Sequence, residues 1–243
     1  MSFPQAVEGT GLLAKISDIL ASHDFLLQLN SLELLTGLAL TTQGQKYLET
    51  SGVIARLNTM LLDCPNLPFA DILMPGMIST HFSPLCDSPL LGLVKFWGNV
   101  AHLRPREVLL KYPAIVTTLA NMVQSDDPTA QTVALETLGY IGVSLEGKSA
   151  LLESGNMVTE CVDKLTNLIH HSTTELKITA LNALASLIKL DKENQSLEML
   201  SVTESWFRRS PDLIVSLTEL LKQPFLDLRY KSYPLTCHLT PDT

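Results

Sequence analysis

The chain has 243 residues, of which 46% are hydrophobic and 17% are charged. A chain with this much apolar material is neither disordered nor collagen-like. Acidic residues (25) outnumber basic ones (17), the net charge is −8, and no basic run is longer than Arg208-Arg209. Because recognition of a nucleic-acid backbone requires a basic stripe, we expect no nucleic-acid partner.

Leucine is the most abundant residue, with 47 copies, whereas only 6% of the residues are aromatic. Unbranched side chains favour helices because they lose little rotamer freedom there. No segment alternates between apolar and polar residues for long enough to indicate a strand. The sequence therefore predicts an all-α fold.

The four cysteines are far apart and contain no CxxC pair, which favours a reducing compartment over a disulfide framework. The first residues have neither a basic start nor an apolar signal segment, and no apolar run approaches the ~18 residues of a membrane span. We therefore expect a soluble protein of the cytoplasm, with the nucleus as a second compartment and no membrane partner. The cysteines are Cys64, Cys86, Cys161 and Cys237.

The sequence contains an internal repeat. Residues 32–52 align without a gap on 135–155, a shift of 103, and residues 94–123 align on 32–61, a shift of 62. A further copy begins near Leu181. Each copy opens with a helix whose apolar residues recur at i, i+3, i+4 and i+7. These first helices are predicted at Leu27–Leu40, Val94–Leu103, Thr132–Val143 and Leu176–Leu190.

After its first helix, each copy is predicted to continue through a glycine break, a short amphipathic piece and a second glycine into a last helix. The breaks are placed at Gly44 and Gly147, the second glycines at Gly52 and Gly155, and the short pieces at Gln45–Glu49 and Lys148–Glu153. The last helices are predicted at Val53–Leu61, Ile115–Val123, Met157–Ile169 and Leu213–Leu221. Small residues of the first helices are expected to let neighbouring helices approach closely, namely Gly37, Gly98, Gly139, Ala183 and Ala185.

A helical unit of about 42 residues cannot bury both its faces alone, whereas stacked copies bury a continuous core. We therefore predict an armadillo/HEAT-like α-solenoid, a right-handed superhelix forming one domain over 1–243. The glycine punctuation is more typical of armadillo than of HEAT repeats. Five of the 13 prolines lie between residues 63 and 92. Because proline does not fit a helix interior, we predict a loop or insert at about 63–92. Pro234 opens an irregular tail predicted at about 234–243.

The segment Gly142–Ser149 matches the phosphate-binding pattern GxxxxGK[ST]. A true P-loop follows a buried strand, but the residues before this segment have helical spacing, so we expect a turn between helices. Nucleotide binding by a P-loop is kept as the second of two alternative functions; the leading function and the first alternative follow below. Ser186 and Lys189 match the short SxxK pattern, which we interpret as a chance match on a helix. His170-His171 and Cys161 lack further ligands at metal-binding spacing, so we expect no metal site there. No catalytic, cofactor or metal residue is predicted, and the protein is not expected to be an enzyme.

A solenoid offers an extended concave surface, which we expect the last helix of each copy to line. We predict that a protein partner binds the polar faces of these helices. The predicted partner-binding residues are Arg56, Asn58, Thr118, Asn121, Lys164 and Asn167. Thr59, Gln124, Glu219 and Lys222 lie on the same polar faces.

Several stretches, spread in order along the chain, resemble a family of armadillo/HEAT-like chaperones for assembly of the base of the proteasome regulatory particle. They are Gly44–Leu48, Leu93–Asn99, Tyr112-Pro113, Gln124–Pro128, Glu146–Lys148, Glu175–Ile178, Thr203–Phe207 and Gln223–Phe225. The chain is similar to a middle section of a family member roughly twice as long, with residues 77–92 as an insertion.

This resemblance implies a non-enzymatic chaperone without a cofactor. It would bind the C-terminal domain of a base ATPase subunit together with associated base subunits, and leave before the complete particle forms. The first alternative is a generic armadillo-type protein–protein interaction adaptor. Armadillo import adaptors carry repeated Trp-x-x-x-Asn pairs. That array is missing here, because the residue four places after Trp97 is Ala101 and the residue four places after Trp206 is Ser210. Terminal repeats without a polar cap also predict self-association.

Overall fold

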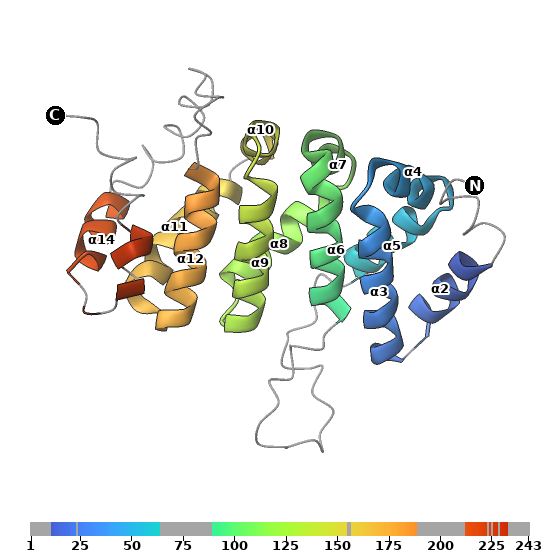
Figure 1. Cartoon of the computed structure of the whole chain (residues 1–243), viewed down its shortest axis with the longest axis horizontal. Coiled ribbons are helices and arrows are strands. Elements are labelled where there is room, and N and C mark those ends of the chain that lie inside the picture. The colour runs from blue at the N-terminus through green and yellow to red at the C-terminus, as the bar shows by residue number, and fades with distance from the viewer. Residues whose placement is uncertain are drawn as a thin grey trace, which may run out of the picture. The chain divides into compact units, whose positions relative to one another are not determined.

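The computed structural model describes residues 11–22, 24–63, 89–154, 157–188, 212–222, 224, 226–227 and 229–232. All the regular elements in these ranges are helices, which confirms the all-α prediction (Figure 1). The chain divides into two compact units, Met1–Arg104 and Pro105–Thr243, each of which is described by itself. The prediction of a single domain therefore stays a prediction.

In the first unit, α3 is the central helix and packs against α2, α4 and α6, while α5 packs against α4 and α6. Its largest buried side chains are Phe96 and Trp97 of α6, whose rings meet edge to face with centroids 5.9 Å apart. The helices are α2 (Leu12–Leu20), α3 (Phe25–Ala39), α4 (Thr42–Thr50), α5 (Val53–Asp63) and α6 (Pro89–Leu103).

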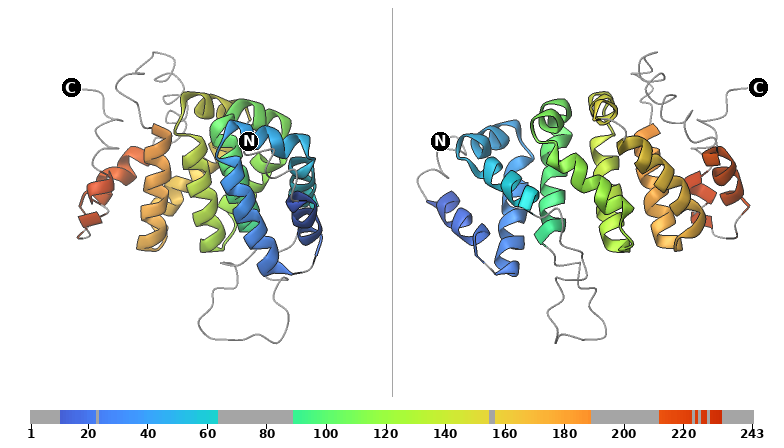
Figure 2. Two further views of the ribbon diagram at one scale, coloured as in Figure 1. Left: turned by 45° about the vertical axis from the view of Figure 1, so that its right-hand side comes forward. Right: turned by 180° about the vertical axis from the view of Figure 1, so that it is seen from behind.

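The second unit consists of helices paired in layers. α9 lies beside α12, α8 beside α11 and α7 beside α10, and α14 packs on α11 (Figure 2). Each pair brings together equivalent helices of successive copies, which is the stacking that the repeat predicts. The helices are α7 (Pro105–Lys111), α8 (Ala114–Gln124), α9 (Pro128–Ile141), α10 (Leu145–Glu153), α11 (Met157–His171), α12 (Thr174–Ile188) and α14 (Asp212–Leu220). Residues 226–227 and 229–232 are also helical.

The 103-residue shift of the sequence reappears in individual hydrogen bonds. Asp24 caps α3 and Asp127 caps α9, each by accepting backbone N–H groups of the first turn. The amide of Gln28 donates to the carbonyl of Ser22 at 2.5 Å, and that of Gln131 donates to the carbonyl of Ser125 at 2.6 Å. These side chains fix the loop that enters the first helix of each copy.

Gly44 and Gly147 do not break a helix, contrary to the prediction. Both lie in the first turn of the short helix, and the N-caps Thr41 and Ser144 accept their N–H groups at 3.0 Å. A Cβ on either glycine would come within 1.9 Å of a carbonyl oxygen, that of Leu38 or of Ile141. Glycine is therefore required here by close approach to the preceding helix.

The second glycine behaves as predicted where the structure describes it. Gly52 has φ +78°, a left-handed conformation that favours glycine, and it separates α4 from α5. Gly155 lies outside the described residues. The close-approach prediction holds for Gly139, whose Cβ would lie 3.1 Å from Ala183 Cα. It is wrong for Gly37, because a Cβ there would meet nothing within 4 Å.

The predicted helices are found with ends shifted by a few residues. The predicted loop at 63–92 reaches too far, because α6 starts at Pro89. Proline is tolerated in the first turn of a helix, where its missing N–H leaves no hydrogen bond unmade. Helix α7 was not anticipated, although Pro105 at its start and Lys111 in its last turn are typical helix boundaries. Residues 64–88, Leu190 and the predicted tail at 234–243 lie outside the described residues.

Candidate protein-binding surfaces

Four of the six predicted partner-binding residues lie on the adjacent helices α8 and α11. Thr118 and Lys164 are half-buried, and Asn121 and Asn167, one turn further along, are exposed. Each pair is separated by the same 46 residues, so the two helices present equivalent positions. We name Thr118, Asn121, Lys164 and Asn167 the α8–α11 face.

The two helices that present the α8–α11 face each bury an apolar stripe on their opposite side. α8 buries Ile115, Leu119, Met122 and Val123, and α11 buries Cys161, Leu165, Leu168 and Ile169. Both sets follow the spacing of a helix with one buried stripe, so the polar residues between them point away from the core. Substitutions at Asn121 and Asn167 should therefore leave the packing intact.

The remaining two predicted residues lie on α5 in the other unit. Arg56 is exposed and occupies the position of Thr118, since the two are 62 residues apart, as in the sequence repeat. Asn58 is half-buried and does not match Asn121, whose counterpart in the repeat is Thr59. Thr59 is exposed and donates its hydroxyl to the carbonyl of Ala55 at 3.1 Å.

A second surface, which the sequence reasoning missed, is a groove of about 240 Å³ between α9 and α12. Gly139 and Ala183 form its floor, because their small size brings the two helices together. Exposed Glu136 and Asn182 stand on its walls, and Lys231 donates to Asn182 Oδ1 at 2.7 Å. We name this the α9–α12 groove. It is lined by Glu136, Gly139, Tyr140, Val143, Thr179, Asn182, Ala183 and Ser186.

A signal for this groove exists in the sequence. Polar residues at Glu136, Thr179 and Asn182 interrupt helices that are otherwise strongly apolar, and a small residue accompanies them on each helix. These small residues were predicted only to let helices pack closely, and the groove that they leave beside them was not predicted.

One cluster in the second unit has the composition of a catalytic triad. His170 of α11 hydrogen-bonds Ser216 Oγ of α14 through Nε2, and its Nδ1 lies 3.8 Å from the Glu219 carboxylate. The Ser216 hydroxyl, however, donates to the carbonyl of Asp212 at 2.7 Å, and Ser216 is buried. Because the hydroxyl proton of Ser216 is used in that hydrogen bond, the Nε2–H of His170 must be the donor to Ser216 Oγ. The cluster therefore fastens α14 to α11 and leaves no accessible nucleophile.

The GxxxxGK[ST] segment contains the predicted turn between two helices at residues 142–144, and its GKS part lies in α10. Gly142 is the C-cap of α9, and α10 begins at Leu145. Lys148 is fully buried, and its Nζ donates to the carbonyl of Val143 at 3.1 Å. A phosphate-binding lysine must reach an open loop, so the geometry contradicts the P-loop alternative.

Neither a metal site nor a membrane span is seen in the part of the chain that the structure describes. There, no three His, Cys, Asp or Glu side chains gather closely enough to hold a metal ion. Over the same residues, no helix has the length and apolar character that crossing a membrane requires.

Layered helical repeats with a short connecting helix define an armadillo-type α-solenoid. A designed armadillo repeat protein in complex with a (KR)4 peptide superposes with a TM-score of 0.63 and 14% identity, over 98% of this chain and 85% of that one. An engineered protein gives a TM-score of 0.63 with 18% identity, over 97% and 84% of the two chains. At such identities the likeness concerns the fold alone, and it confirms the predicted class.

The sequence places the chain within that class. The family model of the proteasome non-ATPase 26S subunit matches residues 3–240, and the chain belongs to this family. The 26S proteasome non-ATPase regulatory subunit 5 of Homo sapiens is 31% identical over 221 residues, 90% of this chain and 41% of that protein. The Bos taurus protein is 32% identical over the same shares. The resemblance found from the sequence is thus confirmed, and the chain spans about two fifths of these relatives.

Proposed function

We propose that the chain is a non-enzymatic chaperone for assembly of the base of the proteasome regulatory particle. In this proposal it binds the C-terminal domain of a base ATPase subunit together with associated base subunits in the cytoplasm, and it is absent from the mature proteasome. The observation that carries the proposal is the family match over residues 3–240. The mechanism is steric, because holding an intermediate masks surface that must not yet engage the core particle.

The α8–α11 face supports the proposal as the binding surface. It offers the amides of Asn121 and Asn167 and the ammonium of Lys164 on helices whose positions are fixed by a buried core. Because the helices are already fixed, docking of a partner has to order only these side chains and not the backbone that carries them. A folded domain with complementary polar groups is the partner that such a surface suits.

The test is capture by the immobilised chain. Isolated C-terminal domains of the base ATPases should be retained, whereas complete proteasomes should not. The double variant Asn121→Arg with Asn167→Arg should weaken capture at least about tenfold, because bulky charge is placed at the centre of the interface. Leu110→Arg, at an exposed position of α7, is the matched control and should capture normally. Retention of complete particles without any free ATPase domain would refute the proposal.

A generic armadillo-type adaptor is the second candidate, and the α9–α12 groove favours it. The groove has acidic Glu136 on its wall, and the similar designed armadillo protein is in complex with a (KR)4 peptide. An adaptor of this kind would take a basic peptide. Titration with a labelled Lys/Arg peptide tests it: saturable binding that Glu136→Gln removes would support the adaptor, and no binding at low salt would exclude this ligand.

A further inference from the structure

The α9–α12 groove has a polar end and an end with aromatic and aliphatic side chains. α9 and α12 lie side by side and run in the same direction, because they are equivalent helices of successive copies (Figure 1). They meet most closely where a Cβ on Gly139 would lie 3.1 Å from Ala183 Cα. The groove residues before this contact are Glu136, Thr179 and Asn182, and those after it are Tyr140, Val143 and Ser186.

The polar end of the groove presents oxygen atoms that accept hydrogen bonds. Glu136 is exposed, and its carboxylate can only accept. The hydroxyl of Thr179 donates to the carbonyl of Glu175 at 3.2 Å, so its proton is used and its oxygen is left to accept. Among the described residues that line the groove, none is basic. A cationic group is therefore the ligand that this end suits.

The chain itself brings such a group to the groove wall. Lys231 Nζ donates to Asn182 Oδ1 at 2.7 Å, although the two residues are 49 positions apart in the sequence. Because an ammonium group can only donate, Asn182 turns its amide oxygen towards Lys231. The contact is exposed, so water and salt weaken it. Lys231 is thus held at the wall by a hydrogen bond that another cation can replace.

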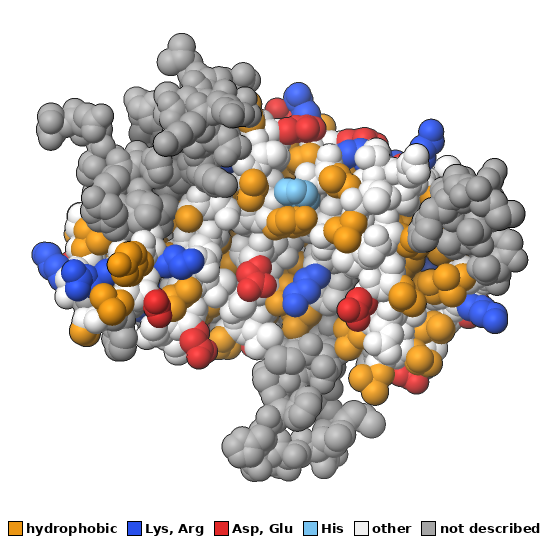
Figure 3. Space-filling view, viewed as in Figure 1, with side chains coloured by type: hydrophobic (Ala, Val, Ile, Leu, Met, Phe, Trp, Pro, Cys, Tyr) orange, Lys and Arg blue, Asp and Glu red, His pale blue; other side chains and the backbone are white. Residues whose placement is uncertain are grey.

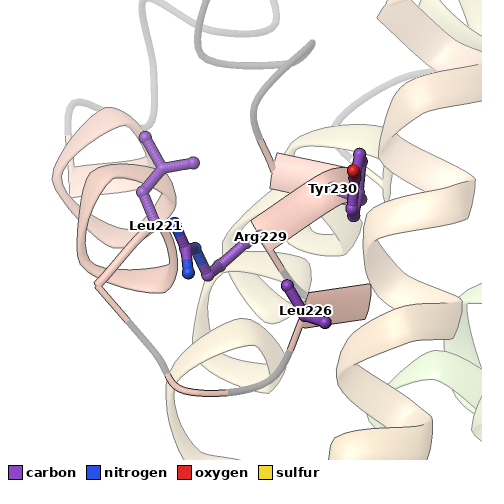
Figure 4. A pocket seen from close by; sticks show the side chains of 4 residues that line it. All are labelled: Leu221, Leu226, Arg229 and Tyr230. Atoms are coloured by element: carbon purple, nitrogen blue, oxygen red, sulfur yellow. The ribbon is translucent and has the colours of Figure 1, made fainter.

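Lys231 belongs to the short helical segment 229–232, in which Ser232 is buried. Arg229, a second basic residue of this segment, lines a separate hollow beside Leu221. Figure 4 shows the Arg229 side chain extending towards Leu221. Two cations of one segment therefore have different surroundings, and Lys231 is the one that contacts the groove wall.

The charges on α9 and α12 leave the polar end of the groove negative. The charged residues within these two helices are Glu136, Glu175 and Lys177. Lys177 is directed at α11, where its Nζ donates to the carbonyl of His170 at 3.1 Å. Figure 3 shows the face over α9 and α12, where charged side chains stand singly among uncharged ones. The cation that meets the groove thus comes from outside these two helices, from Lys231.

We propose that Lys231 is a built-in competitor for the ligand of the α9–α12 groove. The groove takes a lysine or arginine side chain of a partner segment, whose cationic head lies between Glu136 and Asn182. The aliphatic stem of that side chain packs along Tyr140 and Val143, since long basic side chains bury their stems and keep their charge in polar surroundings. Lys231 has to release Asn182 Oδ1 before the head can bind. The inference rests on the basic-peptide ligand of the adaptor candidate and adds the group that regulates its binding.

The test is titration of the whole chain with the labelled Lys/Arg peptide. Lys231→Gln removes the competing ammonium and should tighten binding about two- to fivefold, because an exposed ionic contact is weak and closes the site in only a fraction of the molecules. Arg229→Gln is the matched control, since it removes the same charge two positions earlier and leaves the Lys231–Asn182 contact in place. The long-range effect of a lost charge is common to both variants, so the difference between their dissociation constants isolates the contact.

A double variant shows whether the gain arises in the groove. Glu136→Gln with Lys231→Gln should lose binding as Glu136→Gln alone does, because the freed Asn182 then lacks the carboxylate across the groove. Thermal melting of each variant verifies that its fold is intact, which the exposure of Glu136, Arg229 and Lys231 leads us to expect.

Equal affinities of Lys231→Gln and Arg229→Gln would overturn the proposal and leave the adaptor candidate standing. Absence of peptide binding to both the wild type and Lys231→Gln would remove the proposal and the adaptor candidate together. A gain that persists in the Glu136→Gln background would also contradict it, because the peptide would then bind elsewhere. These outcomes are independent of ATPase capture, which is assigned to the α8–α11 face.

Discussion

Gln45 occupies in one copy of the repeat the place that Lys148 takes 103 residues later. Both side chains are fully buried, and each follows the glycine that touches the preceding helix. Gln45 donates to the carbonyl of Ala39 at 2.9 Å, and Lys148 donates to that of Val143 at 3.1 Å. The GK pair of the phosphate-binding pattern is thus one version of a structural position whose task is to satisfy carbonyls at a helix end.

This equivalence predicts how Lys148 can be replaced. Lys148→Met removes the buried donor and should lower the free energy of unfolding by about 1–3 kcal/mol, because a buried carbonyl loses a partner. Lys148→Gln restores a donor and should cost less. Urea denaturation of both variants measures the difference, and equal losses would show that only the length of the side chain matters.

The same reasoning predicts that nucleotide leaves the chain unchanged. ATP with magnesium should not shift the melting temperature, because Lys148 Nζ is engaged inside the protein. Ligand at 100 times its dissociation constant would stabilise the fold by about 2.7 kcal/mol, which a thermal melt detects easily. A shift lost in Lys148→Met would revive the P-loop alternative.

Glycines at Gly44 and Gly147 should be irreplaceable, whereas the one at Gly37 should not. Gly44→Ala or Gly147→Ala forces a Cβ to 1.9 Å from a backbone oxygen and should cost about 3 kcal/mol or more. Gly37→Ala meets no atom within 4 Å and should stabilise α3 by about 0.5–1 kcal/mol. Chemical denaturation of the three variants compares them directly. Similar effects at Gly37 and Gly44 would contradict the close-approach argument.

Buried glutamines should matter more than their exposed neighbours. Gln131 donates to the carbonyls of Ser125 and Val123, so Gln131→Leu should destabilise the second unit by about 1–3 kcal/mol. Exposed Gln43, on α4, is the matched control, and Gln43→Leu should change the unfolding free energy by less than about 0.5 kcal/mol. Amide hydrogen exchange at residues 123–131 locates the effect.

Much of the fold follows from periodicity in the sequence. The helix positions, the 103-residue shift and the need for glycine at Gly52 were predictable because each depends on local spacing or backbone conformation. The role of Gly44 was not, since helix interiors usually exclude glycine. Its reason is the Leu38 carbonyl, whose position depends on how two helices meet.

The candidate surfaces were predictable only in part. Asn121 and Asn167 follow from the polar face of a helix, and the structure adds that α8 and α11 are neighbours. The α9–α12 groove depends on which helices pair, and the i, i+4 pattern of one helix does not contain that information. The predicted partner itself came from the resemblance and not from any residue pattern.

The central claim is tested most directly by the affinity of the purified chain for isolated base ATPase C-terminal domains, measured by calorimetry beside complete proteasomes. The account predicts saturable binding to one such domain, weakened by Asn121→Arg with Asn167→Arg and unchanged by Leu110→Arg, and no binding to the complete particle. Failure to bind any of these domains, with tight binding to finished proteasomes, would contradict it.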